Sequence, residues 1–297
     1  MHIIYITKES PMNIAVLSDI HGNYIALQKC LEYAIAKGIE AFIFLGDYHG
    51  ELAYPQRTLE ILYTLREKYT CYFIRGNKED YWLNYKKNGE KGWRYESSLT
   101  GCLLYVYEHL TDTDFTFLTG LPPVQSITFE GFPTITACHD SPRKTKEKML
   151  PDNAATFSLI EQDTNSLILC GHTHIQTAIE HNGKLALNPG SVGVPLGSQG
   201  KSQFLILYGE HGHWQHEFVS LDYDVEQVIS DLYQEALHIK APFWCQITEH
   251  MLRTGEISHG AVLSRAMAIC TKEYGVCNWP NVPEWCMEQA VREMIPG

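Results

Sequence analysis

Ile14–Asn23 reads Ile-Ala-Val-Leu-Ser-Asp-Ile-His-Gly-Asn, and this stretch decides the fold. Its first half is a short apolar run, the pattern of a strand that is buried on both faces. Its second half places Asp19 and His21 two positions apart, where that strand should end. Because residues i and i+2 of an extended segment point to the same side, we expect a carboxylate and an imidazole to converge there. Such a donor pair suits a transition metal better than calcium or magnesium, which prefer oxygen ligands.

Strands and helices alternate in the segment that follows. We expect a helix capped by Asn23, then strands at Ala41–Leu45 and Thr70–Ile74, with a helix that begins at Pro55 between them. The order strand, helix, strand, helix, strand is typical of a parallel α/β sheet.

The remainder of the chain divides into three regions with different sequence patterns. Lys78–Gly101 is polar and aromatic, so we expect a partly helical and mostly solvated excursion, followed by a helix that is broken near Thr111. Strands are then predicted at Val124–Phe129, Pro133–Cys138, Ser166–Cys170, Ile175–His181, Lys184–Asn188, Ser202–Tyr208 and His213–Ser220. Helical patterns predominate from Tyr223 onward. We therefore predict an α/β body at residues 1–222 and a helical C-terminal appendage at residues 223–297.

Composition favours a cytoplasmic protein that acts on a small molecule. The 297-residue chain has no apolar run near the ~20 residues that a membrane span needs. Met1–Pro11 lacks the pattern of a secretory signal, so we expect an extension outside the core. Nine cysteines without paired spacing favour reduced thiols. A formal net charge of −12 opposes binding to a phosphate backbone, so we expect neither a long nucleic acid nor a membrane as partner. The sequence does not decide the oligomeric state, and a homo-oligomer is one of the alternatives.

Residues that can bind metals stand at the ends of several predicted strands. In an open α/β sheet, ligands bind in the crevice outside the carboxyl ends of the strands, so these side chains should meet there. The set consists of Asp19, His21, Asp47, Asn77, His139, His172 and His174. Separate apolar runs that all end in competent metal ligands are hard to obtain by chance, which favours a metal site over unrelated loop residues.

The order of these motifs resembles that of the calcineurin-like metallophosphoesterase superfamily. Asp-x-His, Gly-Asp, Gly-Asn, a lone His and Gly-His-x-His follow one another between about Asn13 and Leu221. Arg75-Gly-Asn and Asn188-Pro-Gly-Ser are similar to the small prokaryotic phosphodiesterase subgroup. The resemblance implies an α/β fold in which two sheets form an αββα sandwich, with a dinuclear metal site at the strand ends.

The resemblance also implies a ligand set for each metal. One metal would be held by Asp19, His21 and His174, and the other by Asn77, His139 and His172, with Asp47 as the bridge. Two divalent transition metals are expected; manganese or iron is the first expectation, and zinc, cobalt and nickel are the alternatives. Two such cations lower the pKa of a bridging water and clamp the oxygens of a displacement at phosphorus.

Two departures from the family pattern bear on the substrate. Protein phosphatases of the superfamily carry Asp-Arg-Gly shortly after Gly-Asp, whereas this chain has Gly50-Glu51-Leu52, which disfavours a phosphoprotein. The family usually has a histidine after Gly-Asn, near the leaving group, where this chain has Lys78. Lysine offsets phosphoryl charge but is a poor proton donor at neutral pH. Asn77 and Lys78 are the candidate catalytic residues. Because lysine is a poor proton donor, we expect substrates whose leaving groups need little protonation.

Four other residues are candidates for substrate binding. Tyr48 and His49 adjoin Asp47, and Arg143 and Lys144 belong to a basic run after His139 that also fits a solvated loop. The function that these patterns favour is hydrolysis of a small phosphorylated metabolite, a nucleotide or a dinucleoside polyphosphate such as diadenosine tetraphosphate, by a metal-bridging hydroxide. The alternatives are a non-catalytic interaction module on the same fold and a nuclease that acts on short oligonucleotides.

Overall fold

The first strand, β1 (Met12–Leu17), is the central strand of the first sheet. The computed structural model describes residues 12–144 and 146–296, so the predicted N-terminal extension lies outside the described residues. β1 pairs in parallel with β2 (Ala41–Phe44), which pairs in parallel with β3 (Thr70–Phe73). On its other side β1 meets the antiparallel pair β9 (Ser202–Glu210) and β10 (His213–Leu221). The predicted parallel arrangement of the first three strands is confirmed.

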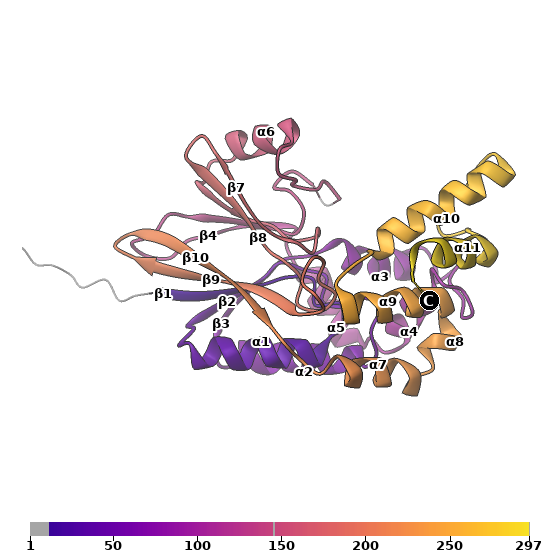
Figure 1. Ribbon diagram of the computed structural model, residues 1–297. Coiled ribbons are helices and arrows are strands. Elements are labelled where there is room, and N and C mark those ends of the chain that lie inside the picture. Colours follow the sequence, from indigo (N-terminus) through magenta and orange to yellow (C-terminus); the bar gives the residue numbers. More distant parts are fainter. Residues whose placement is uncertain (1–11, 145, 297) are drawn as a thin grey trace, which may run out of the picture.

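The middle of the chain builds a second sheet of five strands, in the order β4-β5-β6-β8-β7. Its strands are β4 (Val124–Ile127), β5 (Ile135–Cys138), β6 (Leu167–Leu169), β7 (Gln176–His181) and β8 (Lys184–Pro189). Figure 1 shows the two sheets as adjacent layers, and Ile14 and Val16 of β1 pack against Leu187 in the core between them.

Helices cover the outer faces of both sheets. α1 (Tyr24–Ala36) and α2 (Pro55–Arg66) pack on the first sheet, and α6 (Ala154–Gln162) packs on the second (Figure 1). Because successive side chains of a strand point to opposite faces, Ala15 and Leu17 face the helices. Asn23 caps α1 as predicted, accepting a hydrogen bond from the Ala26 amide at 3.0 Å. The expected two-sheet αββα sandwich is confirmed.

The prediction of a partly helical segment after Asn77 is confirmed, but the expectation that it is mostly solvated is wrong. The segment contains α3 (Asn77–Lys87) and leads to α4 (Gly101–Glu108) and α5 (Asp112–Gly120). Trp82 is fully buried, and its indole N–H donates to the Leu103 carbonyl at 2.9 Å. The segment is polar on average, yet its few large apolar side chains lie on a buried face, which the average composition conceals.

The C-terminal helices bury that face. They are α7 (Val225–Gln234), α8 (Leu237–Lys240), α9 (Pro242–Thr254), α10 (His259–Tyr274) and α11 (Glu284–Met294). Trp82 and Val106 share one hydrophobic core with Ile247 and Met287 of these helices. The helical appendage is therefore present, and it packs on α3 and α4, although the domain boundary at residue 222 stays a prediction.

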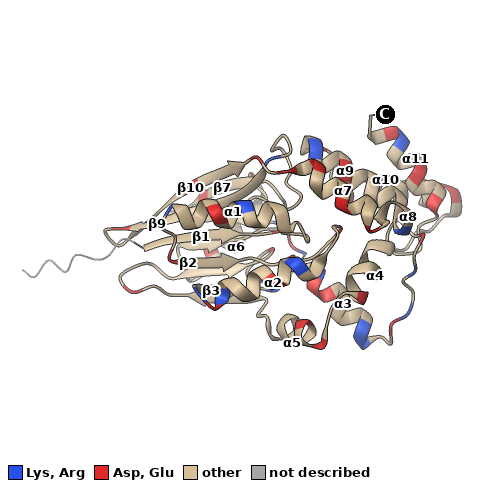
Figure 2. Cartoon of the chain, turned by 90° about the horizontal axis from the view of Figure 1, so that it is seen from below, with Lys and Arg blue, Asp and Glu red and all other residues tan. Residues whose placement is uncertain are grey.

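Charged residues occupy mainly the helices and loops, whereas the strands are largely without them (Figure 2). Basic and acidic side chains are interspersed along α1, α2 and α3. Among the described residues, no helix combines the length and the apolar character that crossing a bilayer requires. All nine cysteines fall in the described part of the chain, and each is a free thiol.

The shared core predicts that Trp82→Ala destabilises the protein strongly. Removing a fully buried indole from a packed core costs about 3–5 kcal/mol, and here it also leaves the Leu103 carbonyl without its donor. Urea unfolding at equilibrium measures the loss. Trp285→Ala on α11 is the matched control, because that side chain is 41% exposed and should cost less than about 1 kcal/mol. Equal losses for the two variants would contradict a common core.

Candidate metal centre

Asp19 and His21 meet for a different reason than the sequence suggested. β1 ends at Leu17, so neither residue belongs to a strand, and both have left-handed backbone conformations, with φ of 54° and 53°. Asp47, His172 and His174 are left-handed as well. Such conformations are uncommon outside glycine, and strained residues cluster at functional sites. Tight left-handed turns, and not an extended segment, aim these side chains at one point.

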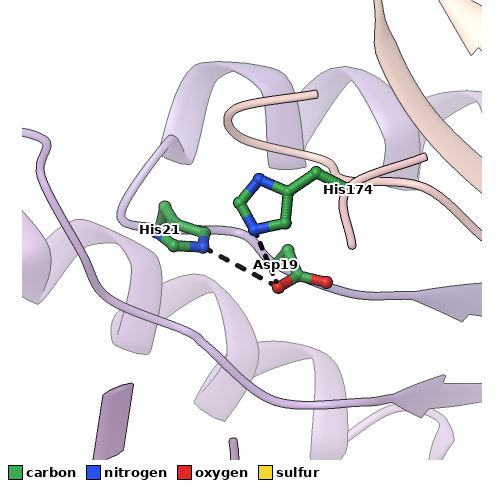
Figure 3. A group of neighbouring side chains, drawn as sticks. All are labelled: Asp19, His21 and His174. Atoms are coloured by element: carbon green, nitrogen blue, oxygen red, sulfur yellow. Dashed lines mark ion pairs between the residues drawn. The ribbon is translucent and has the colours of Figure 1, made fainter. Parts of the chain in front are cut away.

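The first group of donors consists of Asp19, His21 and His174. Figure 3 shows both imidazoles pointing a ring nitrogen at the Asp19 carboxylate. Asp19 Oδ1 lies 3.2 Å from His174 Nε2 and 3.8 Å from His21 Nε2. Asp19 Oδ1 and His21 Nε2 are buried and have no hydrogen-bond partner among the described residues. Since buried polar atoms are normally satisfied, these orphaned donors fit a cation.

The second group is arranged around His139. Its Nε2 lies 3.1 Å from Asn77 Oδ1 and 3.4 Å from Asp47 Oδ1. The other oxygen of Asp47, Oδ2, lies 3.6 Å from His21 Nε2. Asp47 thus faces both groups at once, which is the position that a bridging carboxylate needs.

His172 is accompanied by an acidic residue that the sequence analysis missed. Its Nδ1 lies 2.9 Å from Asp140 Oδ1, and together with His139 these residues form a third cluster of potential metal ligands. Asp140 is fully buried and directly follows His139 in the chain. The adjacent pair His139-Asp140 could therefore be recognised from the sequence, although only His139 was predicted as a metal ligand.

The ring nitrogens that face away from the centre are also held. His139 Nδ1 lies 2.8 Å from the Leu45 carbonyl, His174 Nδ1 lies 2.8 Å from the Val194 carbonyl, and His21 Nδ1 lies 2.6 Å from Glu51 Oε2. A donor at Nδ1 leaves Nε2 free as a ligand, and such partners orient metal-binding histidines. Glu51 is 30 positions from His21, so only the fold reveals this pairing.

Glu79 fixes the loop that carries Asp47. Its carboxylate accepts hydrogen bonds from the backbone amides of Gly76, Asp47 and Tyr48 at 2.7, 3.0 and 2.9 Å. Burial, reinforced by the nearby charge of Asp47, raises the pKa of Glu79 to about 7. The Lys78 amide donates to Asp47 Oδ1 at 2.8 Å and fixes the bridging carboxylate from another side.

Mutual pairing sets the charge state of the metal-free centre. Burial alone would raise the pKa of Asp19, but His174 and His139 hold it well below its ordinary value. Burial would lower the pKa of His21, but Glu51 and Asp19 raise it to about 9. In the same way Asp47 and Asp19 outweigh burial and raise the pKa of His139. Carboxylates and imidazolium groups therefore compensate one another where no cation is bound.

The four residues proposed to bind substrate do not border the pocket beside this centre. Tyr48 and His49 are fully buried: the Tyr48 hydroxyl donates to the Ile74 carbonyl at 2.7 Å, and the His49 ring packs edge-on against Trp82. The prediction that they line the pocket is wrong, because both side chains turn into the core. Arg143 and Lys144 are exposed and pair with Glu147, which agrees with the alternative interpretation of this run as a solvated loop.

A cavity of about 250 Å³ opens beside the metal ligands. Its polar side includes His21, Asp47, Asn77, Lys78 and His172, with Lys148 from the basic run. Its lining also includes apolar side chains, some from the segment before and around α4 and from the loop at Leu196, and others from the C-terminal helical region: Leu99, Leu103, Leu196, Trp244, Met251, Leu263 and Trp279. His259, at the start of α10, also lines this cavity.

An αββα sandwich with clusters of candidate metal ligands at its strand ends is the arrangement of a metal-dependent phosphoesterase. Residues 12–211 match the model of the calcineurin-like phosphoesterase superfamily domain, and the chain belongs to that superfamily. The protein is accordingly a metal-dependent phosphoesterase. The C-terminal helices α7 to α11 lie outside the matched range.

Similar proteins support the same fold. An uncharacterised protein of Methanocaldococcus jannaschii is 27% identical over 248 residues, which cover 78% of this chain and 94% of that protein. The crystal structure of a hypothetical protein from Pyrococcus horikoshii superposes with a TM-score of 0.68 at 20% identity and covers 83% of this chain and all of that one. A metallophosphoesterase from Sphaerobacter thermophilus gives a TM-score of 0.61 at 19% identity, with coverage of 78% and 98%.

The raised pKa of His21 predicts that metal binding depends on pH. A metal requires the neutral imidazole, whereas a His21 pKa of about 9 keeps that ring protonated at neutral pH in the metal-free protein. The apparent affinity for Mn²⁺ should therefore rise with pH up to at least about pH 9, about tenfold per unit for each proton displaced. Calorimetric titration in buffers of different ionisation enthalpy counts the released protons. Binding at pH 7 without proton release would contradict this account.

Proposed function

We propose that this phosphoesterase hydrolyses a small phosphorylated metabolite, a nucleotide or a dinucleoside polyphosphate. The observation that carries the proposal is one cavity lined both by candidate metal ligands and by apolar and aromatic side chains. When bound, the two cations would activate a water molecule and offset the charge of the phosphoryl oxygens. Asp19, His21 and His174 would hold one of them, and His139, Asn77 and His172 the other, with Asp47 between them.

The polar side of the cavity suits a phosphate group. Lys78 and Lys148 add positive charge beside the metal ligands. Burial alone would lower the pKa of Lys78, but Glu51 and Asp47 raise it above its ordinary value. A lysine held in its charged form stabilises anionic oxygens and is a poor proton donor. This supports substrates whose leaving groups need little protonation, such as nucleotides leaving from phosphoanhydrides.

The apolar side suits a ring system attached to that phosphate. Trp279 stacks on Tyr81 with ring centroids 5.4 Å apart, and Trp244 stacks on His259 with centroids 4.5 Å apart. Both tryptophans border the cavity, and a purine or pyrimidine packs well on such surfaces. A dinucleoside polyphosphate would place one of its two nucleosides against this wall.

The size of the cavity argues against larger substrates. A volume of about 250 Å³ accommodates a phosphate with one ring system. The motif Gly50-Glu51-Leu52, in place of the Asp-Arg-Gly of protein phosphatases, disfavours a phosphoprotein. A nuclease needs a positively charged groove that follows the backbone, whereas the formal net charge of this chain is −12. The complete set of metal ligands supports an enzyme over a non-catalytic interaction module.

A substrate panel assayed with Mn²⁺ tests the proposed function. We expect hydrolysis of nucleotides, dinucleoside tetraphosphates and aryl phosphodiesters, with slow or absent hydrolysis of dialkyl phosphodiesters. Asp47→Asn is the inactive reference, because it removes the charge that offsets repulsion between two cations. Equal rates on aryl and alkyl diesters would contradict the argument from Lys78, and a preference for oligonucleotides would favour the nuclease.

The aromatic wall predicts a selective effect of Trp279→Ala. Loss of one stacking surface costs about 1–3 kcal/mol per base, or roughly 5- to 150-fold in kcat/KM. Thymidine 5′-(4-nitrophenyl) phosphate should suffer this loss, whereas methyl 4-nitrophenyl phosphate, which has the same leaving group, should react nearly as before. Trp285→Ala is the control, since Trp285 is partly exposed and does not border the cavity. A similar loss for both esters would show that the wall does not bind the ring.

A further inference from the structure

Glu51 is buried within the metal centre but is not one of its clustered metal ligands. Its side chain is 3% exposed, and both carboxylate oxygens are engaged. Oε2 lies 2.6 Å from His21 Nδ1, and Oε1 accepts a hydrogen bond from the Lys78 ammonium group. A buried carboxylate with two such partners is fixed in position.

The chain is built to bring Glu51 against this imidazole. A Cβ at Gly50 would lie 2.3 Å from His21 Nδ1, so only glycine lets the backbone pass so close to the ring. The other ring nitrogen, His21 Nε2, faces Asp19 and Asp47. Lys78, Glu51 and His21 therefore form a continuous line of contacts that ends at the metal ligands.

We infer that Glu51 is the positioning residue of His21 and that Lys78 acts through Glu51, as its counter-ion. Glu51 holds the His21 ring with Nδ1 as donor and Nε2 directed to the metal. Lys78 makes a buried, charged Glu51 tolerable, because an unpaired carboxylate at this depth would be strongly disfavoured. The inference concerns the metal centre and is independent of which phosphoester is the substrate.

The position of Lys78 supports this role over direct contact with phosphate alone. Its side chain is only 13% exposed, and its ammonium group is bound to Glu51. Contact with a phosphate in place of Glu51 would leave that carboxylate without its cation. Lys148, by contrast, borders the same cavity with an exposed side chain. The two lysines are thus distinguishable by experiment.

A double-mutant cycle tests the inference on the full-length protein without substrate. Glu51→Gln, Lys78→Gln and the double variant are loaded with Zn²⁺, and ¹⁵N NMR follows the His21 Nδ1–H signal and its exchange with water. We expect Glu51→Gln to accelerate this exchange and to lower Zn²⁺ affinity about 10- to 100-fold. Lys78→Gln should accelerate the exchange several-fold, although Lys78 does not touch His21, and should add nothing in the Glu51→Gln background.

Controls separate this role from a general loss of structure. Lys148→Gln should leave the His21 signal unchanged, because Lys148 only borders the cavity. Glu51→Asp keeps the charge and should restore part of the metal affinity, and circular dichroism verifies that each variant is folded. An unchanged His21 signal in Lys78→Gln, or additive effects of the two substitutions, would overturn the inference. Failure of the substrate panel would leave this result standing, since no turnover is measured.

Discussion

The carboxylate of Asp47 faces both groups of candidate metal ligands at once, and the geometry of the centre follows from its position. Its Oδ1 is directed to His139 and its Oδ2 to His21. A single buried acid can hold this position only if its backbone is fixed, and Glu79 and the Lys78 amide provide the necessary hydrogen bonds. The loops after β1 and β2 also adopt left-handed backbone conformations at the residues that carry these groups, which are Asp19, His21 and Asp47.

Each sheet contributes one half of this centre. Asp19, His21, Asp47 and Asn77 follow strands of the first sheet, whereas His139, His172 and His174 follow strands of the second. Packing of the two sheets through the core around Val16 and Leu187 therefore brings the two halves into contact. Stability of the sandwich and geometry of the site are consequences of the same interface.

The C-terminal helices turn an open metal centre into a bounded pocket. They share a core with α3 and α4 and contribute Trp244, Met251 and Leu263 to the lining of the cavity. Residues 12–211, which match the superfamily, contain the candidate metal ligands and part of the apolar lining, and the C-terminal helical region contributes the rest of that lining.

Local patterns and motif order were enough to predict the strand and helix order, the cap at Asn23 and the candidate metal ligands at the strand ends. The side chains that support those ligands become visible only once the chain is folded. Glu51 and Glu79 were not recognisable, since their partners are far apart in the chain and hydrogen bonding between such residues leaves no local pattern. Tyr48 and His49 adjoin Asp47 in sequence yet turn into the core, because adjacent residues need not point the same way.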